Sequence, residues 1–254
     1  MVSRWFAQNE IGPGATIRLD KETWIVAEAC AERVFQYHIS ECKSNNPPAS
    51  YATIRVACTG PGSSPKAHLR IYKQIPTAGI EAESPAFRRQ QARAWDPPEL
   101  EALRMLTRKG SKFTPRLLDS MSNRQKESDF IPDGFLVYVV WEVVPGYPLG
   151  TCVTLGENVF WGLGPDKREL IRQQFQHKYS RLCKWGVMPL HGRASHLVWE
   201  DESATLYFVG FFMANTRIKD KWSPLRWCAW GLAKRPSPSL PGPDWDGNTE
   251  NWEW

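Results

Sequence analysis

Two histidines, His191 and His196, are the residues best suited to catalysis or ligand binding in this chain of 254 residues. An imidazole ring titrates near neutral pH, so it can act as an acid, a base or a metal ligand. A catalytic zinc site needs a third protein ligand, and the spacing of the remaining candidates, His68 and Glu142, does not indicate one. We therefore predict no metal site. The alternative to a chemical role is a structural one, in which each ring forms hydrogen bonds with the loop backbone.

The composition is that of an ordinary globular protein, with 42% hydrophobic and 23% charged residues. The net charge of +5 is small, so we expect no nucleic-acid partner, and the pairs Arg88-Arg89 and Arg108-Lys109 are predicted to be solvated helix faces. The six cysteines form no C-x-x-C pair, which favours reduced thiols and a cytoplasmic location. The chain shows no apolar leader and no run of about 18 apolar residues, so we expect no membrane association.

The elements that must position these histidines are predicted from hydrophobic periodicity. Alternation of apolar and polar residues predicts three antiparallel strands early in the chain, at 33–43, 51–58 and 68–75. Two helices are expected next, at 86–95 and from Asp96-Pro97-Pro98-Glu99 to Gly110. The remainder predicts a buried strand, a long amphipathic helix and two strands joined by a charged turn, at 135–144, 167–185, 196–199 and 205–209.

The last segment, 236–254, is rich in proline and tryptophan. Each proline removes a backbone donor and fixes φ, so a regular helix or a central strand is not expected. We predict an extended segment whose indole rings dock on the rest of the chain or remain mobile. The functional alternative is a lid over a ligand.

Several sequence segments, taken in their order along the chain, resemble those of a known family. They are LRIYKQIP, PPELEALRMLTRKGSKFTPRLLDS, VVWEVVPGYPL, and GVMP ahead of a loop that ends in LVW and LYFV. Together they resemble protein kinases and aminoglycoside phosphotransferases, and more narrowly a group of small kinase-like proteins of filamentous fungi. The resemblance implies an α+β, two-lobed, protein-kinase-like (phosphotransferase-like) fold. Its implied parts are a β-rich lobe with a helix around 97–109, a trimmed helical lobe with the catalytic loop, and the tail, at 1–142, 143–235 and 236–254.

The resemblance also assigns positions in the first lobe. A kinase holds the phosphates with a strand lysine that pairs with a helix glutamate. Here the strand position holds Arg70, and the helix position is best matched by Glu99, with Glu101 as second choice. A guanidinium is not a like-for-like replacement for a compact ammonium. The glycine-rich phosphate loop is also missing, since SNNPPAS stands between the strands at 33–43 and 51–58.

The catalytic loop matches in two registers. Anchoring on His191-Gly192 places Arg193 at the catalytic aspartate and Val198 at the metal-binding asparagine. Anchoring on GVMP and LVW, which we prefer, places His191 and His196 there. The aspartate of the metal-binding D-F-G element matches Gly210. Magnesium prefers oxygen ligands, so the resemblance implies a degenerate member, a pseudokinase without cofactor or metal.

The implied cleft is apolar and aromatic where a kinase cleft is charged. An apolar pocket with a few polar groups suits a small hydrophobic organic molecule. We expect His191, Arg70 and Tyr207 to make the polar or catalytic contacts, and other residues to line the cleft, namely Glu99, Glu142, His196, Trp199, Gly210, Phe211 and Phe212. The alternative is that the rings fill the space.

Three functions follow. The first is a metal-free, ATP-independent step such as a cyclisation, an isomerisation or a pericyclic reaction in fungal secondary metabolism. The second is a non-catalytic pseudokinase that acts as a binding or scaffold module. The third is a residual atypical small-molecule kinase. The sequence indicates neither the substrate nor an oligomeric state.

Overall fold

The computed structural model describes residues 3–38, 40, 48–60, 66–151, 159–217, 220–236 and 245–254. The architecture is mixed α/β. Its contacts divide the chain into two compact units: Met1–Leu100 with Arg116–Val143, and Glu101–Pro115 with Val144–Trp254. Helix α3 (Pro98–Arg108) contributes residues to both units.

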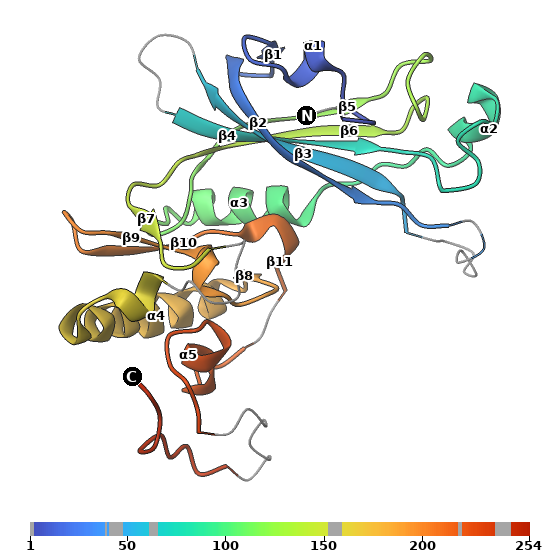
Figure 1. Cartoon of the computed structure of the whole chain (residues 1–254). Helices are drawn as coiled ribbons and strands as arrows, with labels where there is room; N and C mark the ends of the chain where they lie inside the picture. The colour runs from blue at the N-terminus through green and yellow to red at the C-terminus, as the bar shows by residue number, and fades with distance from the viewer. Residues whose placement is uncertain are drawn as a thin grey trace. The chain divides into compact units, whose positions relative to one another are not determined.

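The first unit is built on a six-stranded antiparallel sheet in the order β1-β2-β3-β4-β6-β5 (Figure 1). β2 is its longest strand, with 13 residues, and β1 and β5 lie at its edges. The bounds are β1 (Thr16–Arg18), β2 (Thr23–Phe35), β3 (Tyr51–Thr59), β4 (Lys66–Gln74), β5 (Leu117–Arg124) and β6 (Phe135–Glu142). The same unit contains two short helices, α1 (Gln8–Ile11) and α2 (Pro85–Arg89).

Strand β4 carries different kinds of side chain on the two faces of this sheet. Successive side chains of a strand point to opposite faces. Leu69 and Ile71 belong to the hydrophobic core that also contains Trp5 of the N-terminal segment. Arg70 and Tyr72 point to the other face. The face with Leu69 and Ile71 is therefore covered by the start of the chain, and Arg70 and Tyr72 are presented on the opposite face.

The second unit is organised around the long helix α4 (Pro165–Trp185). Proline in the first turn presets φ for the helix, and Gly186, with φ of 76°, ends it in the left-handed conformation that glycine tolerates. Phe175 and Tyr179 on one face of α4 pack in an aromatic core, with ring centroids 5.3 Å from Phe208 and 6.5 Å from Trp230 respectively. Phe208 pairs with Leu197, the residue after His196, so this core is connected to the segment that carries the two histidines.

Short elements complete the second unit. One three-stranded sheet has the order β10-β9-β7, and a two-stranded sheet pairs β11 with β8. Their bounds are β7 (Tyr147–Pro148), β8 (Met188–Pro189), β9 (Leu197–Glu200), β10 (Thr205–Phe208) and β11 (Ala214–Asn215). The helices are η2 (Val159–Gly162), η3 (Ala194–His196), η4 (Phe211–Met213) and α5 (Leu225–Ala229).

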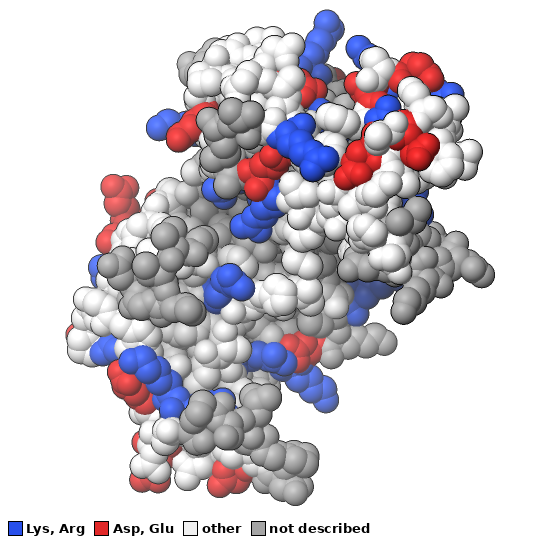
Figure 2. All heavy atoms as spheres, turned by 45° about the vertical axis from the view of Figure 1, so that its right-hand side comes forward, with Lys and Arg blue, Asp and Glu red and all other residues white. Residues whose placement is uncertain are grey.

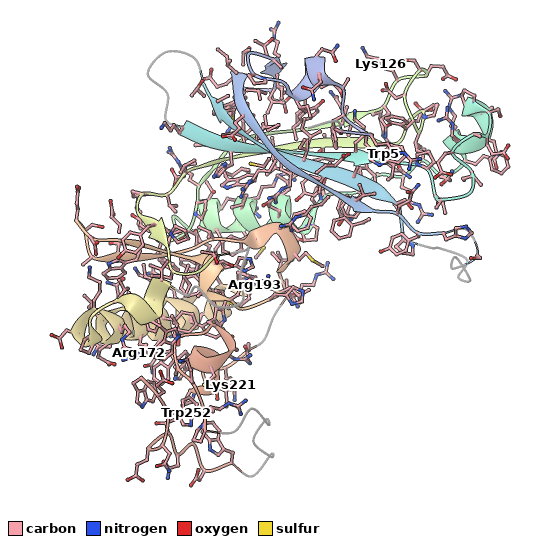
Figure 3. The ribbon with its side chains drawn as sticks, viewed as in Figure 1. Trp5, Lys126, Arg172, Arg193, Lys221 and Trp252 are labelled. Atoms are coloured by element: carbon pink, nitrogen blue, oxygen red, sulfur yellow. The ribbon has the colours of Figure 1, made fainter. Side chains whose placement is uncertain are left out.

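The described part of the tail, 245–254, packs on this second unit. Arg172 places its guanidinium over the ring of Trp254, 5.2 Å from the centroid, and the Trp227 centroid lies 5.3 Å from that of Trp254. Trp252 stacks on Trp254 at 5.7 Å. Arg172 and Trp252 are labelled in Figure 3. Trp254 therefore makes a cation–π contact and an edge-to-face ring contact with the body of the unit.

Most predicted elements are confirmed, with small shifts at their ends: β3, β4, β6, α3, α4, β9 and β10. The strand predicted at 33–43 is wrong in its bounds, because β2 starts at Thr23 and ends at Phe35. Register shifts at Val26/Glu28 and Ala29/Glu32 interrupt its alternation, which hides the first half of the strand from a period-two pattern. Residues 41–47, with much of the predicted SNNPPAS turn, lie outside the described part of the chain.

The helix predicted at 86–95 is also wrong, because α2 ends at Arg89. Tertiary hydrogen bonds explain this end. The carbonyl of Gln91 accepts from the Gln74 side chain at 2.7 Å, and its side-chain oxygen accepts from the Thr77 backbone at 3.1 Å. These bonds hold the chain in an extended course that competes with helix propensity. The edge strands β1 and β5 were not predicted, and β5 reads as the mostly polar LLDSMSNR.

Two further expectations concern partners. None of the described helices is both long enough and apolar enough to cross a membrane. On the face drawn in Figure 2, basic and acidic side chains are interspersed over the described residues.

Candidate functional site

The predicted site residues fall in both units. Arg70, Glu99 and Glu142 belong to the first unit, and the other seven belong to the second. The structure brings Arg70 and Glu99 together, but not Glu142. In the second unit it brings His191, His196 and Gly210 together.

Arg70, Tyr72 and Glu99 form a buried polar cluster. Arg70 Nη1 lies 2.5 Å from Glu99 Oε1, and the Tyr72 hydroxyl donates to Glu99 Oε2 at 2.8 Å. The Arg70 and Glu99 side chains are 12% and 4% exposed. β4 and the first turn of α3 hold them at this distance. Both carboxylate oxygens of Glu99 are therefore engaged within the cluster.

The electrostatics of this cluster favour the ion pair. Burial alone would lower the pKa of Arg70, but the neighbouring Glu99 and Tyr72 outweigh it and raise that pKa above its ordinary value. Burial, reinforced by the Glu99 charge, raises the pKa of Tyr72 well above its ordinary value. The arginine guanidinium also lies 5.1 Å from the centroid of the Trp141 ring. The cluster thus contains a permanent cation, a carboxylate and a neutral phenol.

His68 lies on the same face of β4 as Arg70, two residues away. Burial, with the positive charges of Arg55 and Arg70, lowers the pKa of His68 to about 4. Its Nδ1 is buried and has no hydrogen-bond partner among the described residues. Glu142 pairs with Ala67, which places it on the opposite face of the sheet from His68. A metal site that uses both side chains is therefore excluded by the register.

Glu142 is occupied by a different partner. Its Oε1 accepts from the backbone N–H of Arg116 at 3.0 Å, and its Oε2 lies 3.4 Å from Arg116 Nε. The side chain is 31% exposed. These contacts tie the start of β5 to the end of β6, so Glu142 makes a local link within the sheet rather than joining the Arg70 cluster.

In the second unit, the two histidines are joined through the backbone. The Nδ1 of His196 lies 2.9 Å from the carbonyl oxygen of His191, so the ring donates if that nitrogen carries the proton. The backbone of His196 is held at both ends, because its N–H donates to Arg193 at 2.9 Å and its carbonyl accepts from Val209 at 2.8 Å. This is the structural arrangement weighed above for His196. His191 itself is exposed.

The ring of His196 fills the space beside Gly210. Gly210 has φ of 81°, and a Cβ atom at this position would lie 2.4 Å from both Cγ and Cδ2 of His196. Real Cβ atoms do not approach other atoms so closely. With the present position of the His196 ring, no side chain fits at residue 210.

The aromatic residues predicted to line a pocket have different surroundings. Trp199 is 1% exposed and its indole N–H donates to Asp201 at 2.7 Å. Phe211 is 2% exposed, whereas Phe212 is half-buried. The half-buried Tyr207 donates its hydroxyl to Glu200 at 3.4 Å. Trp199 and Phe211 are therefore part of the core of the second unit.

Two apolar residues near His191 were not among the predicted site residues. Leu190 is 53% exposed and Met213 is 41% exposed. The backbone N–H of Leu190 donates to the carbonyl of Met213 at 2.7 Å, so they are neighbours across the pairing of β8 and β11. The only sequence signal is that Leu190 directly precedes His191. Which apolar residues of a loop stay exposed depends on pairing that the local sequence does not reveal.

These residues do not fit the magnesium that a phosphoryl-transfer site requires. The two positions that the resemblance assigns to metal ligands hold His196 and Gly210, and neither supplies a side-chain oxygen. Within the described ranges, no three His, Cys, Asp or Glu side chains are grouped so that they would hold a metal ion.

Comparisons with known proteins find similarity among solved structures. No family model matches the chain, and no curated protein matches it. Among solved structures, the chain is similar to PK-1, a kinase of Cydia pomonella granulovirus, with a TM-score of 0.44 and 9% sequence identity. The match covers 72% of this chain and 52% of the viral kinase, so the chain spans about half the length of that kinase. At this identity no residue role passes from the viral protein to this chain.

Proposed function

We propose that this chain is a kinase-like protein that does not transfer phosphoryl groups, and that the loop around His191 binds a small hydrophobic molecule. The observation that carries the first part is the contact between His196 and Gly210. A carboxylate at residue 210 would need the volume that the imidazole ring fills, 2.4 Å from the glycine Cβ position. Phosphoryl transfer depends on metal ions bound by carboxylates, so the contact supports the proposal that the position which the resemblance assigns to a metal ligand does not serve as one.

The exposed apolar residues next to His191 support the second part. Leu190 and Met213 are 53% and 41% exposed and adjacent. Covering apolar surface of this kind with a ligand is favourable, because it removes that surface from water. His191 supplies a titratable ring at its edge. A site with these groups suits a metal-free step, such as a cyclisation, an isomerisation or a pericyclic reaction, in which holding the reactive conformer removes part of the entropic barrier. A place in fungal secondary metabolism is proposed from the sequence resemblance alone.

One observation favours a second candidate, a non-catalytic binding module. Trp199 and Phe211 are 1% and 2% exposed, so they fill the core instead of lining a cavity. Turnover separates the two candidates. Any reaction that the chain accelerates should fall at least about tenfold in His191→Gln if that ring acts as acid or base. Unchanged turnover would contradict the catalytic role of His191.

The absence of phosphoryl transfer is tested with ATP and magnesium. We expect no thermal shift with ATP, with magnesium or with both, and no release of phosphate above the rate in buffer. A shift that requires both ATP and magnesium would refute this part and support the residual kinase.

The apolar site is tested with N-phenyl-1-naphthylamine, a neutral probe whose fluorescence rises in apolar surroundings. Burial of a leucine or methionine side chain contributes roughly 1.5–3 kcal/mol. We therefore expect Leu190→Asp and Met213→Asp each to weaken probe binding about tenfold. Leu170→Asp is the matched control, because Leu170 is 40% exposed on α4. Equal effects of the three changes would contradict the site.

A further inference from the structure

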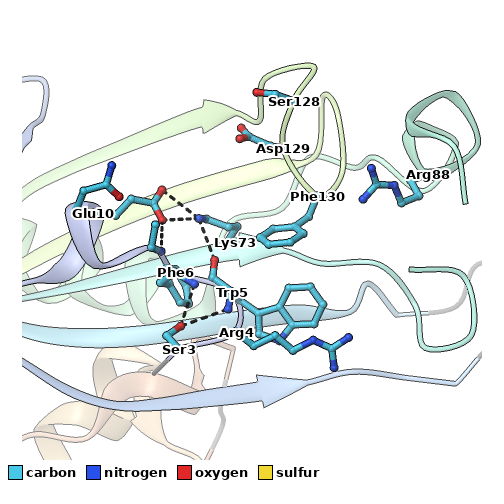
Figure 4. A pocket seen from close by; sticks show the side chains of 12 residues that line it. Ser3, Arg4, Trp5, Phe6, Glu10, Lys73, Arg88, Ser128, Asp129 and Phe130 are labelled. Carbon is cyan, nitrogen blue, oxygen red and sulfur yellow. Dashed lines mark hydrogen bonds and ion pairs between the residues drawn. The ribbon is translucent and has the colours of Figure 1, made fainter. Parts of the chain in front are cut away.

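A pocket of about 530 Å³ lies in the first unit, on the face of the sheet opposite Arg70. Lys73 of β4 lines it, and Lys73 alternates with Arg70 and Tyr72 along the strand. The N-terminal segment with Trp5 and the loop with Phe130 form its walls (Figure 4). This volume lies in the range of about 300–1,000 Å³ that is usual for small-molecule sites. The pocket is thus separate from the residues considered above.

One end of the pocket is closed by an ion pair. Lys73 is 7% exposed, and its Nζ lies 3.1 Å and 3.0 Å from the two carboxylate oxygens of Glu10 and 3.1 Å from the carbonyl of Trp5. An ammonium group has three donors, so all three are satisfied. Lys73 and Glu10 therefore hold α1 on the sheet and leave no charge of this pair for a ligand.

The other end holds a cation, Arg88, that has no acidic partner among the described residues. Arg88 points toward Phe130 from α2 (Figure 4). Its Nε is buried and has no hydrogen-bond partner, and no ion pair of its guanidinium occurs within the described ranges. The adjacent Arg89, by contrast, pairs with both Glu127 and Asp133. A buried donor without an acceptor is unusual in proteins, and an oxyanion in the pocket would supply the missing acceptors to this guanidinium.

The wall between the two ends is aromatic. Trp5 and Phe130 meet edge to face, with centroids 4.8 Å apart and planes at 76°. Arg4 covers the ring of Trp5, with its guanidinium carbon 4.5 Å from the centroid, and its side chain is 64% exposed. Such a wall offers a flat ring both stacking and edge contacts.

The charge of the lining is positive by one. Arg4, Lys73 and Arg88 are basic, and Glu10 and Asp129 are acidic. The Asp129 carboxylate accepts from the backbone N–H of Lys126 at 2.6 Å. The excess charge therefore suits a ligand that carries a single terminal anion.

We propose that this pocket binds a small organic anion that combines a flat ring with a terminal carboxylate or phosphate. The ring packs against Trp5 and Phe130, and the oxyanion accepts hydrogen bonds from Arg88. Both oxyanions match the fork of a guanidinium, so the structure favours their shared chemistry.

Calorimetric titration of the full chain with four probes tests the proposal. Benzoate and phenyl phosphate carry the ring and each of the two oxyanions, benzamide carries the ring without charge, and inorganic phosphate carries the charge without the ring. We expect benzoate or phenyl phosphate to bind, and the tighter of the two identifies the oxyanion. If neither binds, or if benzamide and inorganic phosphate bind as tightly, the proposal is overturned.

Two variants locate the site. Arg88→Gln should weaken the binding of the favoured probe about tenfold or more, as expected for a lost charge-assisted hydrogen bond. Arg89→Gln is the matched control, because it removes the same charge from the next residue of α2 and should change the affinity less than about twofold. Far-UV circular dichroism confirms that both variants are folded. Equal effects of the two changes, or no effect of Arg88→Gln, would show that the probe binds elsewhere and would overturn the proposal.

Discussion

Removal of one partner from the buried pair of Arg70 and Glu99 should destabilise the protein severely. Glu99→Leu leaves the guanidinium of Arg70 charged in a place where its side chain is 12% exposed, and it removes the carboxylate that lies 2.5 Å away. An uncompensated buried charge of this kind costs about 3–5 kcal/mol. The Tyr72 hydroxyl, which donates to Glu99 at 2.8 Å, loses its acceptor in the same variant. We therefore expect the free energy of unfolding to fall by an amount near the upper end of that range.

The double variant separates the pair from its surroundings. Arg70→Met with Glu99→Leu removes both charges and leaves apolar side chains of similar length. Replacement of a buried pair by apolar residues often changes stability little. The free energy of unfolding should therefore fall far less in the double variant than the sum of its decreases in the two single variants. The coupling energy of the cycle should be at least about 3 kcal/mol. An exposed pair provides the comparison: Lys234 and Glu253 are 55% and 60% exposed and 2.9 Å apart. Their coupling should stay below about 1 kcal/mol.

Urea unfolding followed by far-UV circular dichroism measures both cycles. Equal coupling energies for the buried and the exposed pair would refute the reasoning, because it attributes the difference to burial. A stabilising effect of Glu99→Leu alone would refute it as well, since it would mean that Arg70 finds a carboxylate or water in place of Glu99.

Three other changes test single contacts by the same urea measurement. Gly210→Asp should lose about 2–4 kcal/mol through the clash with His196 and the strained φ, and His196→Ala in the same chain should recover most of that loss. The pKa of His68 is lowered from its ordinary value of 6.5 to about 4 in the folded protein. Between pH 6.5 and pH 4, the unfolded chain therefore binds a proton at His68 that the folded chain does not bind. Stability should therefore fall by about 2 kcal/mol as the pH falls through that window, after allowance for partial exposure, and His68→Gln should abolish this slope. Gly146→Ala should cost about 3 kcal/mol, since its Cβ would lie 2.2 Å from the carbonyl oxygen of Trp199; a loss below about 1 kcal/mol would contradict the close approach.

Predictions from the sequence succeed where a single period dominates. The strand at 51–58 and the helix at 167–185 have uninterrupted patterns, and the structure places β3 at Tyr51–Thr59 and α4 at Pro165–Trp185. They fail where long-range contacts decide. The bulges of β2 shift its register against β3, and Gln91 ends α2 through bonds to a strand that precedes it by 17 residues. Neither contact leaves a local signal.

The candidate site shows the same division. The sequence places Arg70 on a strand and Glu99 in a helix, and it allows their pairing, which the structure contains. It does not reveal that Glu142 lies on the other face of the sheet from His68, because that depends on the register of β6 against β4. It also does not separate Arg88 from Arg89. The two are neighbours of the same type, and the positions of Glu127 and Asp133 give Arg89 ion pairs that Arg88 lacks within the described part of the chain.

Within each unit, residues at positions that the sequence resemblance assigns to kinase chemistry pack against one another. The ring of His196 fills the volume that a side chain at Gly210 would need. In the other unit, Arg70 and Tyr72 together use both oxygens of Glu99. Contacting residues do not contribute independently to stability, so a change at one of them alone leaves a clash or an unpaired group. A single substitution at one of these positions should therefore cost stability. These residues are part of what holds each unit in its native packing, whichever molecule the protein binds.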